Sequence, residues 1–180
     1  VETLMADRTV LPVRFGTVLA DETAVQSLLA AHYADFVAGL RRVRGRVELG
    51  LRALWISDFR FPIFDCRKLA IENRQSKIEN PSGRAYLLAR LEEERRAQAQ
   101  RQRAEALAAE LHAPLARLAA ENTQQVLVTP SLLLKAAYLV ERDRVAAFRQ
   151  ETEALSVAYP SLRFLCTGPW PAYNFVTSSR

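Results

Sequence analysis

The spacing of apolar residues changes along the first part of the chain. Residues 9–19 are an apolar, β-branched run that predicts a strand or strand-turn. Residues 23–44 carry apolar side chains at helical spacing, which predicts one amphipathic helix. Asp21 or Thr23 is suited to cap this helix. Residues 46–55 alternate between apolar and polar side chains, as in a half-buried strand.

The second part of the chain repeats this alternation of helical and extended patterns. It predicts a long helix, two strands joined by a turn, a second helix and a last strand. Their expected bounds are 82–120, 125–129, 132–141, 143–159 and 162–167. Pro114 should kink or split the long helix, because proline has no N–H and its ring meets the preceding turn. Asp143 should cap the second helix, and the polar middle of the long helix should project into solvent as an arm.

The order of these elements predicts an α+β fold. From residue 46 on, the order is strand, helix, strand, strand, helix, strand, which is the ferredoxin-like or split βαβ arrangement with an antiparallel sheet. We therefore expect a ferredoxin-like C-terminal domain over residues 45–176. Residues 1–44 supply one strand and one helix, which is too little to close a domain. We expect them to be the remnant of an N-terminal α/β domain whose front half is missing.

A segment at residues 56–80 differs in composition from the rest of the chain. It holds all four isoleucines, and the tripeptide Ile-Glu-Asn occurs in it twice. A sudden shift of this kind predicts an inserted surface excursion, with an ordinary variable loop as the alternative.

The overall composition is that of a folded chain with a basic balance. Of the 180 residues, 49% are apolar, and the net charge is +5. No apolar run approaches the roughly 20 residues that a membrane-spanning helix needs, and no signal peptide is visible. Cys66 and Cys166 are far apart in the sequence and predict no disulfide framework. These features favour a cytoplasmic protein with no membrane partner.

The residue types that carry catalysis or bind cofactors do not form recognisable motifs. The glycines do not cluster, so neither a P-loop nor a dinucleotide-binding fingerprint is present. His32 and His112 are distant in sequence and have no metal-ligand spacing around them. Ser131 and Cys166 are the least implausible nucleophiles, but neither has a neighbouring histidine and acid. We therefore expect no catalytic, metal or cofactor site and a protein that is not an enzyme.

Two other functions remain open at this point. Arginines gather at residues 41–46 and 95–103, which permits nucleic-acid binding. An RNA-binding sheet of this topology needs several aromatic side chains on its strands, whereas the candidate strands offer little beyond Tyr138. We therefore favour a protein without a nucleic-acid partner. The third possibility is a small-molecule or enzymatic domain, which would need a pocket with convergent polar groups.

The C-terminal residues 168–176 form an aromatic tail. Pro169 and Pro171 restrict the backbone around Trp170, and Tyr173 and Phe175 follow at alternate positions. Such a segment can pack against the edge of the sheet or offer an exposed docking surface.

Several stretches, in this order, make the sequence similar to a known family. Residues 10–19 read VLPVRFGTVL, residues 45–51 read GRVELGL, and residues 83–87 read GRAYL. The ending combines AYLV at 137–140 with TGPWPAYNF at 167–175. On these motifs the chain resembles the gas vesicle protein F/L family, whose members usually have a longer N-terminal domain.

The resemblance implies an accessory or minor structural protein of gas vesicle formation. Such a protein would be cytoplasmic and associated with the vesicle. It would contact the major shell protein and other accessory proteins, and would assist nucleation and assembly of the vesicle. We expect the tail and the region around residues 14–16 to take part in docking. The candidate partner-binding residues are Arg14, Phe15, Gly16, Trp170, Tyr173 and Phe175.

Overall fold

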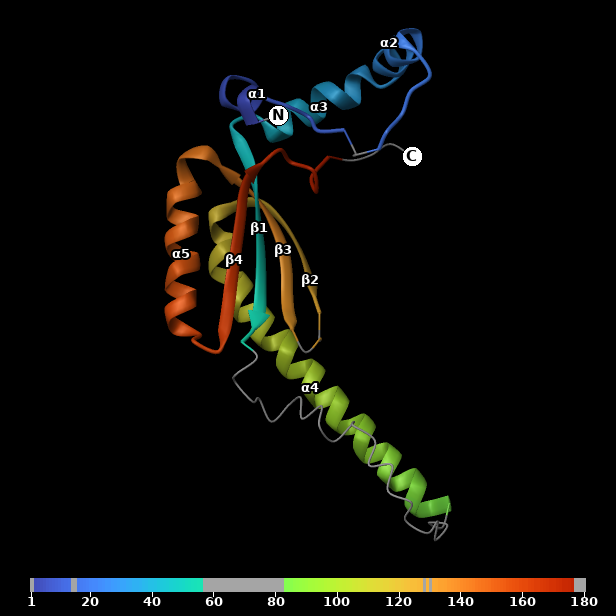
Figure 1. Ribbon diagram of the computed structural model, residues 1–180, viewed down its shortest axis with the longest axis vertical. Coiled ribbons are helices and arrows are strands. Elements are labelled where there is room, and N and C mark those ends of the chain that lie inside the picture. Colours follow the sequence, from blue (N-terminus) through green and yellow to red (C-terminus); the bar gives the residue numbers. More distant parts are fainter. Residues whose placement is uncertain (1, 14–15, 57–82, 128, 130, 177–180) are drawn as a thin grey trace.

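Four antiparallel strands form one sheet in the computed structural model, which describes residues 2–13, 16–56, 83–127, 129 and 131–176. The strands lie in the order β2-β3-β1-β4 (Figure 1). Their bounds are Arg46–Trp55 for β1, Ala119–Val126 for β2, Leu132–Glu141 for β3 and Leu162–Trp170 for β4. The expected α+β class with an antiparallel sheet is confirmed.

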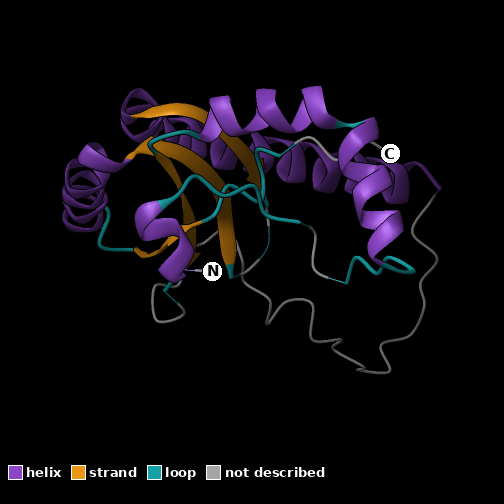
Figure 2. Cartoon of the chain, turned by 90° about the horizontal axis from the view of Figure 1, so that it is seen from above, coloured by secondary structure: helices purple, strands orange, loops and turns teal. Residues whose placement is uncertain are grey.

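Two groups of helices accompany this sheet. Their bounds are Glu2–Asp7 for α1, Glu22–Ala31 for α2, Tyr33–Val43 for α3, Gly83–Leu118 for α4 and Val145–Ala158 for α5, with a 3-10 turn, η2, at Arg142–Arg144. The helices α4 and α5 pack on one face of the sheet and against each other. The helices α2 and α3 extend sideways from the top of the sheet (Figures 1 and 2). None of the described helices is long and apolar enough to span a bilayer.

The main core lies between the sheet and the helices α4 and α5. Alternation along β1 points Leu49 and Leu51 into this core, where they are 0% and 1% exposed. Tyr138 of β3 and Phe148 of α5 are fully buried, with ring centroids 5.0 Å apart. Because each such side chain contributes about 1.5–3 kcal/mol on burial, this layer is the principal source of stability.

A second, smaller core lies on the opposite face of the sheet, at its upper end. It consists of Val43 from α3, Ala137 and Leu139 from β3, and Ala172 and Phe175 from the tail, with Leu11 packed against it. This cluster attaches both the N-terminal segment and the tail to the sheet. Away from this cluster, the face opposite α4 and α5 is lined mainly by exposed polar side chains of the strands, together with the exposed Leu165 of β4.

The N-terminal expectations needed correction. The described part of residues 9–19 contains no strand, because Pro12 has no N–H and Leu11 packs as a loop against the second core. The single helix predicted over residues 23–44 is two helices that meet at His32, whose backbone has φ −114° and ψ 21°. Asp21 caps the first of them, since its Oδ1 accepts from the N–H of Ala24 at 2.7 Å.

The long helix was expected to be kinked or split, but α4 is assigned as one helix through Pro114. Leu111 and Leu115, on either side of the proline, are both 0% exposed and pack in the main core. Their burial contributes about 3–6 kcal/mol, which offsets the cost of about 3 kcal/mol for an internal proline.

Three further predictions for the C-terminal half differ from the structure. The strand expected at 125–129 is β2 at Ala119–Val126, whose place is set by pairing with β3 and not by its own apolar pattern. Asp143 does not cap α5, because it lies within the 3-10 turn that precedes the helix. β4 continues past residue 167 to Trp170. The inserted segment predicted at 56–80 lies, from residue 57 on, outside the described residues.

Candidate partner-binding surface

The face of the sheet opposite α4 and α5 carries a shallow cavity of about 330 Å³. We call it the sheet groove, and its lining includes Gly50, Arg52, Thr123, Lys135, Thr167 and Trp170. The strand pairing explains its shape. Thr123, Ala137, Gly50 and Thr167 are aligned across the four strands, so two small residues lie at the centre of the groove.

Two cations lie directly opposite each other in this groove. Arg52 of β1 pairs in register with Lys135 of β3, and both side chains are exposed. Side chains paired in this way on one face have Cβ atoms about 4.5–5.5 Å apart, and like charges there repel. Within the described part of the chain neither cation has a hydrogen bond or an ion pair.

A buried carboxylate holds the tail at the upper end of the groove. Glu48 of β1 is 5% exposed. Its Oε2 accepts from the backbone N–H of Asn174 at 2.8 Å, and its Oε1 accepts from the side-chain amide of Asn174 at 2.5 Å. A buried carboxylate is costly unless it is hydrogen-bonded, so these contacts explain why Glu48 is tolerated there.

Gly168 allows the chain to pass close to β1 before the tail begins. Its φ is +109°, a conformation that side chains with a Cβ rarely adopt. A Cβ at this position would lie 2.7 Å from the backbone oxygen of Glu48. The carbonyl of Gly168 also accepts from the guanidinium of Arg149 on α5 at 3.0 Å. Gly168 therefore fixes the course of the chain into Trp170.

The six residues predicted to bind a partner have different surroundings. Trp170 and Tyr173 are 42% and 49% exposed, whereas Phe175 is 6% exposed and packs in the second core. Gly16 is exposed and has a φ of +82°. Arg14 and Phe15 lie outside the described residues. The tail is thus attached by one aromatic side chain and presents two others, of which Trp170 borders the sheet groove.

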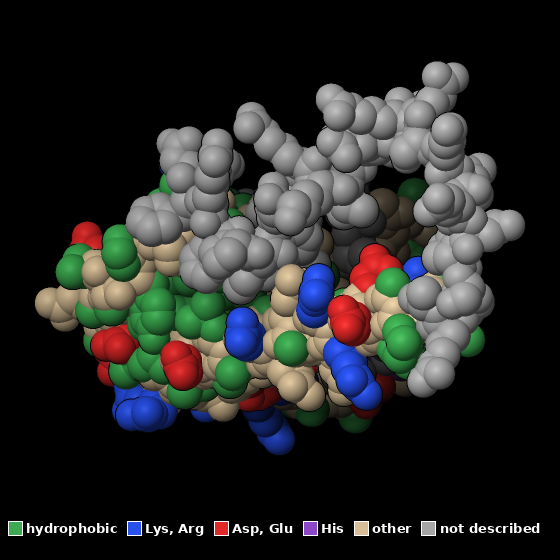
Figure 3. All heavy atoms as spheres, turned by 90° about the horizontal axis from the view of Figure 1, so that it is seen from below, with side chains coloured by type: hydrophobic (Ala, Val, Ile, Leu, Met, Phe, Trp, Pro, Cys, Tyr) green, Lys and Arg blue, Asp and Glu red, His purple; other side chains and the backbone are tan. Residues whose placement is uncertain are grey.

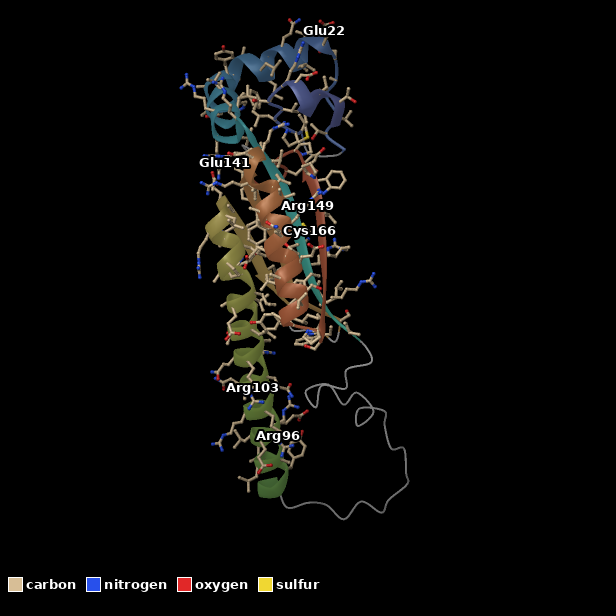
Figure 4. All side chains as sticks on the ribbon, turned by 90° about the vertical axis from the view of Figure 1, so that its left-hand side faces the viewer. Glu22, Arg96, Arg103, Glu141, Arg149 and Cys166 are labelled. Carbon is tan, nitrogen blue, oxygen red and sulfur yellow. The ribbon has the colours of Figure 1, made fainter. Side chains whose placement is uncertain are left out.

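The arginine clusters are partly engaged in contacts within the chain. Arg42 of α3 donates to both carboxylate oxygens of Glu121 on β2, and this contact lowers the pKa of the Glu121 carboxyl. Arg96 lies 3.6 Å from a carboxylate oxygen of Glu92 on the exposed half of α4. Figure 3, seen from below, shows charged side chains of both signs interspersed with hydrophobic ones, and Figure 4 places Arg96 and Arg103 on the projecting arm.

His112 has a structural role. His112 of α4 donates through Nε2 to the Asn122 side-chain oxygen at 3.1 Å and accepts from the Tyr138 hydroxyl at Nδ1 at 2.7 Å. Burial lowers the pKa of His112, although the hydrogen bond to Asn122 opposes this shift. The imidazole therefore connects α4 to β2 and β3.

The candidate nucleophiles gain no catalytic partners within the described residues. Burial raises the pKa of the Cys166 thiol, which disfavours the reactive thiolate. Figure 4 shows Cys166 beside Arg149, whose charge opposes that shift. Ser131 is exposed and directly precedes β3, and its carbonyl accepts from the N–H of Trp55. No group of three potential metal ligands occurs in the part of the chain that the structure describes.

Sequence reasoning missed Glu48, Arg52 and Lys135. Alternation along the two central strands places Arg52 and Lys135 on the side opposite the apolar core residues. This signal was visible in the sequence, but the pairing that sets the two cations opposite each other was not. The contact between Glu48 and Asn174 joins residues 126 positions apart and had no local signal.

The sequence and the fold are both similar to those of known proteins. Residues 1–177 match the family model described as gas vesicle synthesis protein GvpL/GvpF. Gas vesicle protein L of a Streptomyces species is 34% identical over 172 residues, which cover 92% of this chain and 61% of that protein. Gas vesicle protein L1 of Halobacterium salinarum is 27% identical, with 93% and 63% covered.

A crystal structure of the gas vesicle protein GvpF from an Anabaena species has the same fold. Its TM-score is 0.75 at 22% identity, and the match covers 99% of this chain and 71% of that one. The chain spans about three fifths of the length of the curated relatives it matches.

Proposed function

Because the chain belongs to the gas vesicle synthesis protein GvpL/GvpF family, we propose that it is an accessory or minor structural protein of gas vesicle formation. In this proposal it binds the major shell protein and other gas vesicle proteins, and assists nucleation and assembly of the vesicle. The match to the family along residues 1–177 is the observation that carries the proposal.

The proposed mode of action is binding and not catalysis. A shell subunit with an apolar face has to be kept from aggregating until it is placed in the wall. The tail supports such a role, because it presents Trp170 and Tyr173 to solvent on a backbone held by Glu48 and by the burial of Phe175. Aromatic side chains held in a fixed position lose little conformational entropy on binding, which favours their use as anchors.

The proposal includes a finer description of the fold. The element order β1, α4, β2, β3, α5, β4 and the strand order β2-β3-β1-β4 support a ferredoxin-like arrangement for residues 45–176. We propose that residues 1–44 belong to an N-terminal unit that the second core attaches to the sheet, since only Met5 and Val43 among their described apolar side chains are buried. The protein is proposed to act in the cytoplasm, associated with the vesicle.

The docking role of the tail can be tested by pull-down of the shell protein with purified chain. Replacing Trp170 and Tyr173 together by alanine should weaken capture at least tenfold, because truncation of aromatic anchors typically costs 2 kcal/mol or more. Tyr33 and Tyr86 are also exposed, at 69% and 63%, and their double alanine variant is the matched control.

Circular dichroism should give the same spectrum for both variants. If the Trp170 and Tyr173 variant is folded and captures the shell protein as well as the control variant does, the tail is not the docking element. If the unaltered chain captures neither the shell protein nor another gas vesicle protein, the proposed function itself is wrong.

A further inference from the structure

We infer that the sheet groove binds an acidic segment of a partner protein, with Arg52 and Lys135 as its carboxylate-binding residues. This inference rests on the proposed function, because it assigns a chemistry to one of the partners. It concerns the cationic part of the open sheet face, which meets the exposed aromatic side chains of the tail at Trp170.

The first observation is the unfavourable pairing of the two cations. Arg52 and Lys135 are directly opposite each other on neighbouring strands, and both are exposed. Like charges in this arrangement destabilise a sheet. A bound anion would turn this repulsion into attraction, because each cation would then face a carboxylate.

The second observation is that the carboxylates of the four strands are already engaged. Glu48 accepts from Asn174, Glu121 accepts from Arg42, and Glu141 lies 3.4 Å from the guanidinium of Arg144. Among the described residues, Glu121 and Glu141 therefore face other cations, and the Glu48 carboxylate at the upper end of the groove is turned to the tail and not to Arg52 or Lys135.

A third cation adds to the charge of this face. Arg163 is two residues from Leu165, which pairs with Arg52, so it projects from the same side of the sheet. Its side chain is exposed. The lower part of the open face thus carries three cations without a partner in the described part of the chain.

The last observation in favour of an acidic segment is the shape and chemistry of the groove lining. Gly50 leaves room for the Thr167 hydroxyl, which would lie 2.8 Å from a Cβ at that position, while Thr123, Gln125 and Thr167 offer hydroxyl and amide groups along the groove. These groups can pair with the polar groups of a peptide backbone. A single-stranded nucleic acid is less suitable, because its bases need several aromatic stacking partners, and Trp170 is the single aromatic among the described residues that line the groove.

The inference can be tested with two fluorescein-labelled octapeptides, one alternating glutamate with alanine and one alternating glutamine with alanine. Anisotropy is measured with the full chain at low salt. The glutamate peptide should bind, and the glutamine peptide should not. The variant Arg52→Gln/Lys135→Gln should weaken binding about five- to twenty-fold, since each exposed charge pair accounts for about two- to five-fold.

The control variant is Arg101→Gln/Arg103→Gln, which removes the same charge from the exposed arm of α4. It should bind as the unaltered chain does, within twofold. Amide chemical shifts of isotope-labelled chain should change at Gly50, Lys135 and Thr167 when the glutamate peptide is added.

Equal losses for the two variants, or shifts confined to α4, would show non-specific attraction and overturn the inference. Tighter binding of a labelled oligonucleotide at the same amides would assign the groove to nucleic acid instead. If the chain captures shell protein but the groove fails these tests, the inference falls and the proposed function stands. If peptide binding maps to the groove while no gas vesicle protein is captured, the groove is supported as a site for acidic segments and the proposed function is wrong.

Discussion

Replacing Glu48 by alanine should release the tail without unfolding the domain. The carboxylate accepts two hydrogen bonds from Asn174, at 2.8 and 2.5 Å. Hydrogen bonds to a charged group contribute about 1.5–3 kcal/mol each. Because Asn174 is exposed to solvent, we take about 1–2 kcal/mol for each bond and expect a loss of about 2–4 kcal/mol from tail docking. The main core contains no tail residue, so this loss should appear as local opening.

Native-state hydrogen exchange can measure that opening at individual amides. The amide of Asn174 donates to Glu48, and the amide of Phe175 donates to the carbonyl of Ala172 at 3.2 Å. In the Glu48→Ala variant both should exchange about thirtyfold faster or more, as 2 kcal/mol implies. Glu48→Gln should give a smaller increase, because a glutamine side chain keeps one acceptor oxygen.

A matched control comes from another strand carboxylate. Glu141→Ala removes a charge that lies beside Arg144 and not beside the tail, so tail exchange should be unchanged. In a double-mutant cycle, Asn174→Ala should have little further effect in the Glu48→Ala background. The reasoning is refuted if the amides of Asn174 and Phe175 exchange at the same rate with and without the Glu48 carboxylate.

Three other changes have expected outcomes. Burial lowers the pKa of His112, so below about pH 6.5 the unfolded chain binds more protons than the folded chain and the free energy of unfolding should fall. Urea unfolding midpoints measured against pH should show a smaller fall in the His112→Gln variant. Lys135→Glu should raise the free energy of unfolding by about 1 kcal/mol, seen as a Tm increase of about 2–4 °C, because the new carboxylate faces Arg52. A lower Tm would contradict the argument that the two cations repel each other. Gly168→Ala should lower the free energy of unfolding by about 2 kcal/mol or more, because the added Cβ would meet the Glu48 carbonyl oxygen. An unchanged midpoint in chemical unfolding would show that the backbone adapts.

The central strands could be read from the sequence because packing shapes their pattern. β1 and β3 have the bounds that the alternation predicts, 46–55 and 132–141, and both place apolar side chains against α4 and α5. A strand in the middle of a sheet with one covered face needs that alternation. Its signal is therefore local, and it survives in a single sequence.

The edge strand and the helix break had no such local signal. β2 reads AAENTQQV and is mostly exposed, because it has a neighbour on one side only. Its place follows from pairing with β3. The break at His32 likewise falls inside a run of apolar residues with helical spacing, and neither proline nor glycine marks it. The position of β2 thus depends on contact with a distant segment, whereas nothing in the structure explains the break at His32.

The candidate site shows the same division between local and distant information. The aromatic character of the tail was visible in the sequence, but which rings are exposed was not. Burial of Phe175 depends on Val43 and Leu139, which come from different elements. The groove depends on register, because Arg52 and Lys135 meet only when β1 and β3 pair as they do.

The tail and the groove are best understood as one composite surface built on β1. Within five positions of that strand, Glu48 holds the tail, Gly50 forms the floor of the groove and Arg52 supplies one of its charges. Trp170 pairs with Glu48 in register, so the aromatic side chain is fixed at the end of the row that leads to the cations. A partner that contacts this face therefore meets an apolar anchor and a basic site in a fixed relation. Apolar contact gives affinity, and charge gives orientation and selectivity.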